Sequence, residues 1–114
     1  MLETNSNTHV TIYLFTIECN ETNINRIVQI VKSYNQDIKI YQITKSLFTD
    51  FPETGAYSLA CYLRLLAPTL LPDIDKALYL DCDLIVNGDI QELYNINLED
   101  YAVAAVHDAT LSYN

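Results

Sequence analysis

Two Asp-x-Asp triplets, at residues 73–75 and 81–83, are the positions of this chain whose residue types and spacing best suit chemistry. The chain has 15 acidic residues among 114, and about two acid-x-acid triplets would arise in it by chance, so the bare motif carries little information. Asp73 and Asp75 lie in a connector that begins with a proline, where solvent and Lys76 can satisfy them. We therefore assign that first pair a structural role.

Asp81 and Asp83 stand in a different context, because they directly follow an apolar run at residues 77–80. In open α/β sheets, ligands bind beyond the carboxyl ends of the strands. Two carboxylates in a dry crevice disfavour each other's ionised form, and a shared divalent cation resolves that conflict. Oxygen-only ligation suits Mg²⁺ or Mn²⁺, which also take phosphate oxygens from a substrate. The alternative is a solvated β-turn after a strand, and the local pattern leaves both interpretations open.

The elements that would position these side chains alternate between strands and helices. Apolar and β-branched runs predict strands over residues 10–15, 38–43, 77–80 and 102–106. Apolar residues at helical spacing predict a helix near residues 22–34, and a second helix is expected over residues 56–67, ending before Pro68. This order predicts an α/β fold with an open, mostly parallel sheet flanked by helices. Residues 1–9 are expected to be a loose N-terminal end, and residues 10–114 one domain.

The charge of the chain is concentrated in its second half. Residues 1–50 hold five acids and four bases, a balance of −1, whereas residues 51–114 hold ten acids and two bases, a balance of −8. A surface this acidic repels phosphate backbones, so nucleic acid is excluded as a partner. No apolar run approaches the ~18 residues of a membrane span, so no transmembrane segment is expected.

Three scattered cysteines (Cys19, Cys61 and Cys82) do not form the even, spaced set of a secreted disulfide framework. We expect free, buried thiols in a cytoplasmic protein.

Residues 56–108 contain the motifs Tyr62-x-Arg64-Leu65, Lys76-Ala77-Leu78-Tyr79-Leu80-Asp81-x-Asp83, Gly88-Asp89-Ile90-x-Glu92-Leu93-Tyr94 and a strand that ends at Asp108. With these motifs the segment resembles glycosyltransferase family 8, which includes bacterial lipopolysaccharide transferases and glycogenin. The similarity covers about residues 10–108 and is most specific over residues 57–94.

The resemblance implies a partial nucleotide-sugar-binding domain of the GT-A fold, and retaining transfer of a hexose from a UDP-sugar to a saccharide or lipopolysaccharide-type acceptor. Asp81 and Asp83 match the pair that holds Mn²⁺ (or Mg²⁺) against the donor diphosphate. Arg64 matches a helix arginine that contacts the nucleotide sugar, and Asp108 resembles a carboxylate near the sugar subsites. No catalytic nucleophile is identified.

The sequence also departs from the family pattern. The family begins with a strand and a loop whose acid contacts the nucleotide base, and its later half carries a metal-binding His and a His…Gly…Lys segment on the diphosphate. Neither segment is found here, so the resemblance implies a fragment truncated at both ends. We expect such a fragment to be inactive alone and to self-associate through its incomplete sheet.

Two alternatives remain. A phosphotransferase of the haloacid dehalogenase kind also places Asp-x-Asp after an apolar strand. That class has its pair near the start of the domain, with Thr or Val two positions after the second Asp, where this chain has Ile85. The other alternative is a non-catalytic remnant that keeps the fold.

Overall fold

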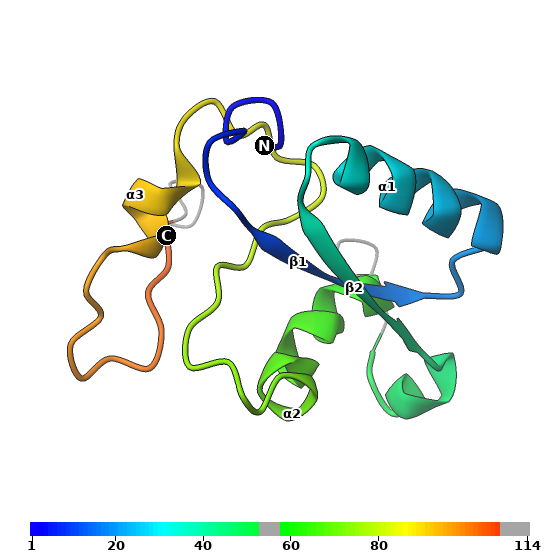
Figure 1. The fold of residues 1–114 in the computed structure, drawn as a ribbon. Helices are drawn as coiled ribbons and strands as arrows, with labels where there is room; N and C mark the ends of the chain where they lie inside the picture. The colour runs from blue at the N-terminus through cyan, green and yellow to red at the C-terminus, as the bar shows by residue number, and fades with distance from the viewer. Residues whose placement is uncertain (53–57, 108–114) are drawn as a thin grey trace.

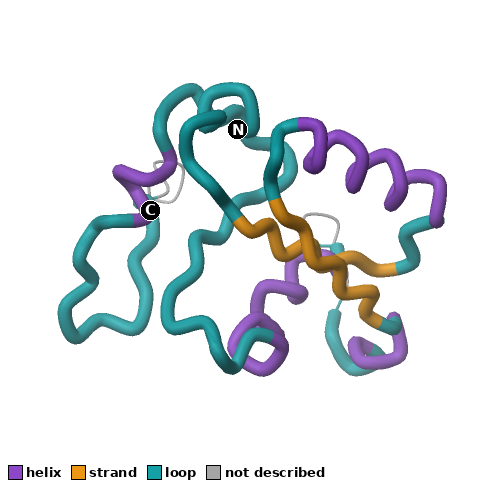
Figure 2. Tube along the Cα trace, viewed as in Figure 1, coloured by secondary structure: helices purple, strands orange, loops and turns teal. Residues whose placement is uncertain are grey.

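The computed structural model describes residues 1–52 and 58–107 of the chain. In these residues the protein is an α/β fold built on a small parallel sheet flanked by helices, which confirms the predicted fold class (Figure 1). Figure 2 shows the strands at the centre, helical segments on either side of them, and loops through much of the second half of the chain.

The sheet is formed by β1 (Thr11–Ile17) and β2 (Asp37–Ile43), which pair in parallel with Thr11 opposite Asp37 and Ile17 opposite Ile43. A parallel pair needs a crossover connection of a dozen or more residues, and helix α1 (Glu21–Ser33) supplies it. These bounds confirm the strands predicted over residues 10–15 and 38–43 and the helix predicted near residues 22–34.

Helix α1 has a cap at each end that the local sequence explains. At its start the Asn20 side chain accepts a hydrogen bond from the backbone N–H of Asn23 at 2.9 Å. Beyond its end, Asn35 adopts a left-handed conformation with φ 54°, which asparagine tolerates better than most residues. The helix is therefore bounded on both sides by asparagine.

Gln36 is buried, with 5% of its surface exposed. Its side-chain amide makes hydrogen bonds to backbone groups just before the sheet begins. Its Oε1 accepts a hydrogen bond from the Val10 N–H at 2.6 Å, and its Nε2 donates to the Thr8 carbonyl at 3.0 Å. The Gln36 amide thus satisfies the backbone just before β1, where pairing with β2 has not yet begun.

The hydrophobic core lies where the carboxyl ends of the strands meet two short 3₁₀-helices, η1 (Lys45–Phe48) and η2 (Leu59–Leu66). Its buried members are Ile43, Phe48, Leu59 and Leu63, and the partly buried residues packed on them are Phe15, Ile17, Tyr41, Tyr62, Leu66 and Leu70. In Figure 1, α1 lies on one side of the sheet, and residues 59–70 lie on the other. Tyr62, which belongs to the first of the family-like motifs, therefore contributes to core packing.

The helix predicted over residues 56–67 differs from the structure in type and in its end. From Leu59 it is a 3₁₀-helix, and helical backbone continues as α2 (Ala67–Leu70) instead of ending before Pro68. Pro68 lies in the first turn of α2, where a missing N–H costs no intrahelical hydrogen bond. The start of the predicted helix, residues 56–57, lies outside the described residues.

The prediction of strands over residues 77–80 and 102–106 is wrong. Within residues 58–107 no strand is present, and the one further regular element is the short helix α3 (Ile90–Tyr94). A strand requires a ladder partner, whereas the backbone here is held by side chains. Lys76 Nζ donates to the Ile96 carbonyl at 2.6 Å, and the Tyr94 hydroxyl donates to the Lys76 carbonyl at 3.1 Å.

The first residues of the chain make hydrogen bonds to a loop far along the sequence. Asn5 is 4% exposed. Its Nδ2 donates to the Gly88 carbonyl at 3.1 Å, and its Oδ1 accepts from the Ile90 N–H at 2.8 Å. Thr4 adds a hydrogen bond to the Val86 carbonyl. The N-terminal segment is therefore attached to the loop that leads into α3.

In the described part of the chain, no helix has both the length and the apolar content needed to cross a membrane.

Candidate functional site

Three residues of the family-like motifs, Arg64, Tyr79 and Asp81, meet around one carboxylate oxygen, Oδ1 of Asp81. The Tyr79 hydroxyl donates a hydrogen bond to this oxygen at 2.6 Å. An Arg64 guanidinium nitrogen lies 3.4 Å from the same oxygen. The guanidinium carbon of Arg64 also lies 4.4 Å from the centre of the Tyr79 ring, a cation–π distance. Arg64, Tyr79 and Asp81 form the candidate site.

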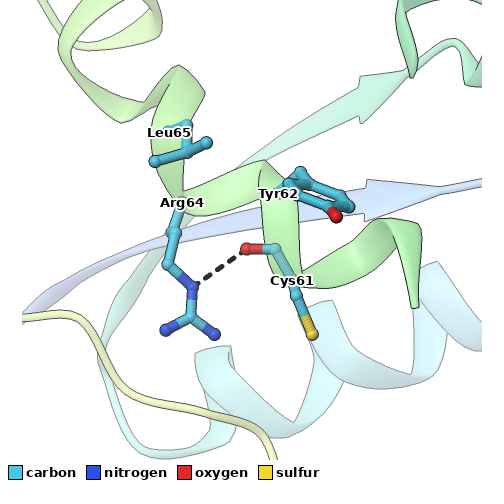
Figure 3. Close-up of a pocket in the computed structure, with 4 residues that line it drawn as sticks. All are labelled: Cys61, Tyr62, Arg64 and Leu65. Carbon is cyan, nitrogen blue, oxygen red and sulfur yellow. Dashed lines mark hydrogen bonds between the residues drawn. The ribbon is translucent and has the colours of Figure 1, made fainter. Parts of the chain in front are cut away.

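Arg64 reaches the site from η2, whose other face is packed into the core. Leu63, the preceding residue, is 6% exposed, and this burial fixes the rotation of the helix. The Arg64 Nε donates to the Cys61 carbonyl at 2.9 Å, so the side chain runs back along the helix (Figure 3). Around it lies an open pocket of about 350 Å³, lined by Cys61, Tyr62, Arg64 and Leu65.

Tyr79 and Asp81 are presented by the aspartate segment, which we define as residues 76–96. The contacts of Lys76 with Tyr94 and Ile96 bring the two ends of this segment together. The contacts of Asn5 with Gly88 and Ile90 attach its middle to the N-terminal residues. Side-chain hydrogen bonds therefore hold the segment in place without a β-ladder.

The electrostatics of the site centre on Tyr79. Partial desolvation of its phenol and the hydrogen bond to the Asp81 carboxylate raise the pKa of Tyr79 to about 12, although the nearby Arg64 charge acts in the opposite direction. The tyrosine is consequently a neutral hydrogen-bond donor at any physiological pH. The Arg64 and Asp81 side chains are 43% and 49% exposed, so both remain accessible to a ligand.

The two aspartates of the motif offer the kind of donor set that a hard cation takes. Asp83 and the intervening Cys82 are exposed, and half of the Asp81 side chain is open to solvent. Among residues 1–52 and 58–107, no group of three His, Cys, Asp or Glu side chains is close enough to hold a metal. Mg²⁺-type ions are commonly bound through one or two carboxylates together with substrate phosphates and water. In number and chemistry, two carboxylates fit that mode of binding.

The structure brings two of the predicted site residues, Arg64 and Asp81, into contact. Asp83 lies two residues further along the exposed loop, and Asp108 lies outside the described residues. Asp73 and Asp75 are exposed in the connector after α2. The predicted position of Asp81 at the end of a sheet strand is wrong, because residues 77–80 pair with no strand in the described chain.

The sequence analysis did not single out Tyr79, which it treated as part of the apolar run at residues 77–80. A signal was available, since residues two apart in an extended chain point to the same side. Tyr79 and Asp81 have this spacing, which places a phenol next to the first aspartate.

The solvent exposure of the cysteines differs from the expectation. All three are free, but Cys82 is exposed and Cys19 and Cys61 are partly exposed, so the prediction of buried thiols is wrong. Cys61 lines the pocket beside Arg64, and Cys82 lies between the two aspartates.

Known proteins are similar to this chain over most of its length. The family model described as glycosyl transferase family 8 matches residues 1–114. A putative glycosyltransferase of Haemophilus influenzae is 33% identical over 100 residues, which are 87% of this chain and 30% of that protein. The lipopolysaccharide 1,2-glucosyltransferase of Escherichia coli is 30% identical over 106 residues, 90% of this chain and 31% of that protein.

A third relative is the lipopolysaccharide 1,3-galactosyltransferase of Salmonella typhimurium, 33% identical over 82 residues, 71% of this chain and 24% of that protein. The chain thus spans less than a third of the length of each of these three curated relatives. No solved structure gives a significant match.

Proposed function

Because this chain belongs to glycosyl transferase family 8, we propose that it forms part of the donor site of a metal-dependent, retaining hexosyltransferase. The proposed donor is a UDP-sugar, and the proposed acceptor is a saccharide of the lipopolysaccharide type. Two of the relatives are named as lipopolysaccharide glucosyl- and galactosyltransferases, which supports both a hexose and this class of acceptor.

One observation carries the proposal: the Arg64 guanidinium and the Asp81 carboxylate lie 3.4 Å apart with both side chains about half exposed. A fixed cation beside a carboxylate suits a diphosphate–metal pair, because the guanidinium can bind phosphate oxygens while the carboxylates bind the cation. A surface ion pair of this kind contributes only about 0–1 kcal/mol to stability, so stability alone does not account for it.

Asp81 and Asp83 are the residues that would hold Mn²⁺ or Mg²⁺. When bound, such an ion supplies Lewis-acid stabilisation of the negative charge on a departing diphosphate. Arg64 contributes a second, permanent positive charge to the same anion. Its Nε–H is bonded to the Cys61 carbonyl and one terminal nitrogen contacts Asp81, so the remaining N–H groups of the terminal nitrogens are the ones available to a ligand. Three free thiols are consistent with a reducing compartment such as the cytoplasm.

Binding of UDP-glucose and UDP-galactose to the purified chain in the presence of Mn²⁺ tests the proposal. We expect weak but measurable binding by calorimetry or ligand-observed NMR, and we expect Asp81→Asn/Asp83→Asn to abolish it. The matched control is Asp73→Asn/Asp75→Asn, which changes the same motif and the same charge eight residues away. Equal donor binding by the two double variants would contradict the assignment of the donor site.

Turnover is a separate measurement, in which UDP release from the same two donors is followed. We expect no release by the 114-residue chain above that of Asp81→Asn/Asp83→Asn. Catalysis of this kind requires donor, metal and acceptor to be held within about an ångström, and the described site offers two carboxylates and an arginine on an open surface. Release well above the double variant would show that Arg64, Asp81 and Asp83 suffice.

A further inference from the structure

We infer that Tyr79 is a positioning residue of this site, which holds Asp81 through its hydroxyl and Arg64 through its ring. The inference rests on the proposed function, because it assigns Tyr79 a role toward the same cation and diphosphate. It goes further by naming a residue that is neither a metal ligand nor a phosphate contact.

The geometry gives Tyr79 contacts with both charged partners at once. Its hydroxyl is 2.6 Å from Oδ1 of Asp81, a short hydrogen bond to a charged acceptor. Its ring centre is 4.4 Å from the guanidinium carbon of Arg64. The direct contact between Arg64 and Asp81 is longer, at 3.4 Å. Tyr79 therefore makes the closer contact with the carboxylate and connects it to the arginine.

The contacts also determine which oxygen of Asp81 is occupied. The hydrogen bonds from Tyr79 and Arg64 both fall on Oδ1. Oδ2 of the same carboxylate is the oxygen that these contacts leave for a cation. A hydrogen bond that orients a metal-ligating carboxylate in this way acts on metal affinity without touching the metal.

The hydroxyl groups of two other tyrosines have different hydrogen-bond partners from that of Tyr79. The Tyr62 hydroxyl donates to the Pro52 carbonyl and the Tyr94 hydroxyl to the Lys76 carbonyl, so both support the backbone. Tyr79 instead donates to a carboxylate side chain. With half of its surface exposed, it also contributes less to packing than a buried aromatic residue would.

The two roles of Tyr79 can be separated by substitution. Tyr79→Phe keeps the ring beside Arg64 and removes the hydrogen bond to Asp81. Tyr79→Leu removes both contacts. Tyr101→Phe is the matched control, because it deletes a hydroxyl from a tyrosine that is 74% exposed and lies outside the site.

The experiment titrates the ¹⁵N-labelled chain with Mn²⁺ alone and follows paramagnetic broadening of the Cys82 and Asp83 amide signals, which detects weak binding. We expect Tyr79→Phe to need about tenfold more Mn²⁺ than wild type for equal broadening, the lower end of the loss that follows removal of a ligand-orienting hydrogen bond. Tyr101→Phe should match wild type. Amide signals of β1 and β2 should be unchanged in every variant, which separates positioning from a loss of structure.

A second titration, with UDP in the presence of saturating Mn²⁺, measures UDP affinity and so reports on the position of the Arg64 guanidinium. We expect Tyr79→Phe to retain more UDP affinity than Tyr79→Leu, because the phenyl ring still supports the guanidinium. If Asp81→Asn loses the broadening but Tyr79→Phe titrates like wild type, the inference about Tyr79 is wrong and the proposed metal site stands. If Asp81→Asn broadens like wild type, or if wild type shows no broadening, the proposed metal site is wrong and the inference falls with it.

Discussion

Residues 10–48 and residues 77–107 both contain runs of apolar and aromatic side chains, yet they fold very differently. In the first region, β1 and β2 pair over their whole length, and Ile43 and Phe48 are buried. In the second, large apolar side chains face solvent. They are Tyr79, Leu84, Ile85, Leu93, Tyr94, Ile96, Tyr101, Val103 and Val106, of which Ile85 is 94% and Val106 91% exposed.

The difference shows that an apolar run is buried only where another element packs against it. The first region contains its own partners, since β1, α1 and β2 follow each other in sequence and pack together. In the second region the described residues supply no strand to pair with residues 77–80 or 102–106. Polar side chains such as Lys76 and Asn5 hold that region instead.

The largest expected effect comes from truncating one isoleucine in each region. Ile43→Ala in β2 should lower the free energy of unfolding by about 2–5 kcal/mol, because it leaves a cavity in the core. Ile85→Ala should change it by no more than about 0.5 kcal/mol, because that side chain is almost fully exposed. Urea denaturation followed by circular dichroism measures both.

If Ile43→Ala fails to fold, Ile43→Val provides the same comparison with a smaller loss of about 0.5–1.5 kcal/mol. Equal losses for the substitutions at 43 and 85 would mean that the two regions are equally well packed, contrary to the comparison.

A smaller effect is expected from two buried side-chain amides: Gln36 lies in the first region, and Asn5 holds the second region by hydrogen bonds to Gly88 and Ile90. Gln36→Ala leaves the Val10 N–H and the Thr8 carbonyl without their partner, at a cost of about 1–3 kcal/mol for each group that stays unsatisfied. Gln29→Ala, on the exposed face of α1, is the control and should be neutral.

Asn5→Ala should act locally rather than on global unfolding. We expect the Ile90 amide to exchange with deuterium at least about tenfold faster, since its acceptor is removed from a region that opens by itself. Protection of the β1 and β2 amides should not change. Loss of protection throughout the sheet would show that the two regions unfold as one unit.

The smallest effect is expected from helix caps of the same chemistry in the two regions. Asn20 caps the 13-residue α1, and Asp89 caps the five-residue α3 through the Gln91 N–H. Asn20→Ala should cost about 1 kcal/mol of stability, and Asn20→Asp should restore it. Asp89→Ala should leave global stability within about 0.5 kcal/mol, because α3 has no buried residue. An Asp89→Ala loss as large as that of Asn20→Ala would contradict the comparison.

The fold could be predicted from sequence where the signals were local. Apolar residues at helical spacing located α1, and apolar, β-branched runs located β1 and β2, because each signal reports on contacts within a few residues. Residues 77–80 have the same apolar character as a strand, but strand formation depends on a partner that the run itself does not specify. The continuation through Pro68 was missed because a proline ends one helix and begins another equally well.

For the candidate site, the sequence indicated residue types more than positions. Arg64 and Asp81 were proposed from their motifs, and the structure places their side chains in contact. The sequence could not show that Tyr79 would join them, because its hydroxyl could equally have faced water. Nor could it show that Asn5 would be buried against Gly88, because polar residues near a chain end usually remain solvated.

The Asn5 contacts also bear on the order in which the chain folds. They join residues 83 and 85 positions apart in sequence, whereas paired residues in β1 and β2 are 26 positions apart. Closing the longer loop costs about 1 kcal/mol more in chain entropy. The contacts that form when it closes are a few hydrogen bonds, without a hydrophobic core. The β1–α1–β2 unit should therefore form first. The aspartate segment would then be fixed late, and it would be among the first parts released when the protein unfolds.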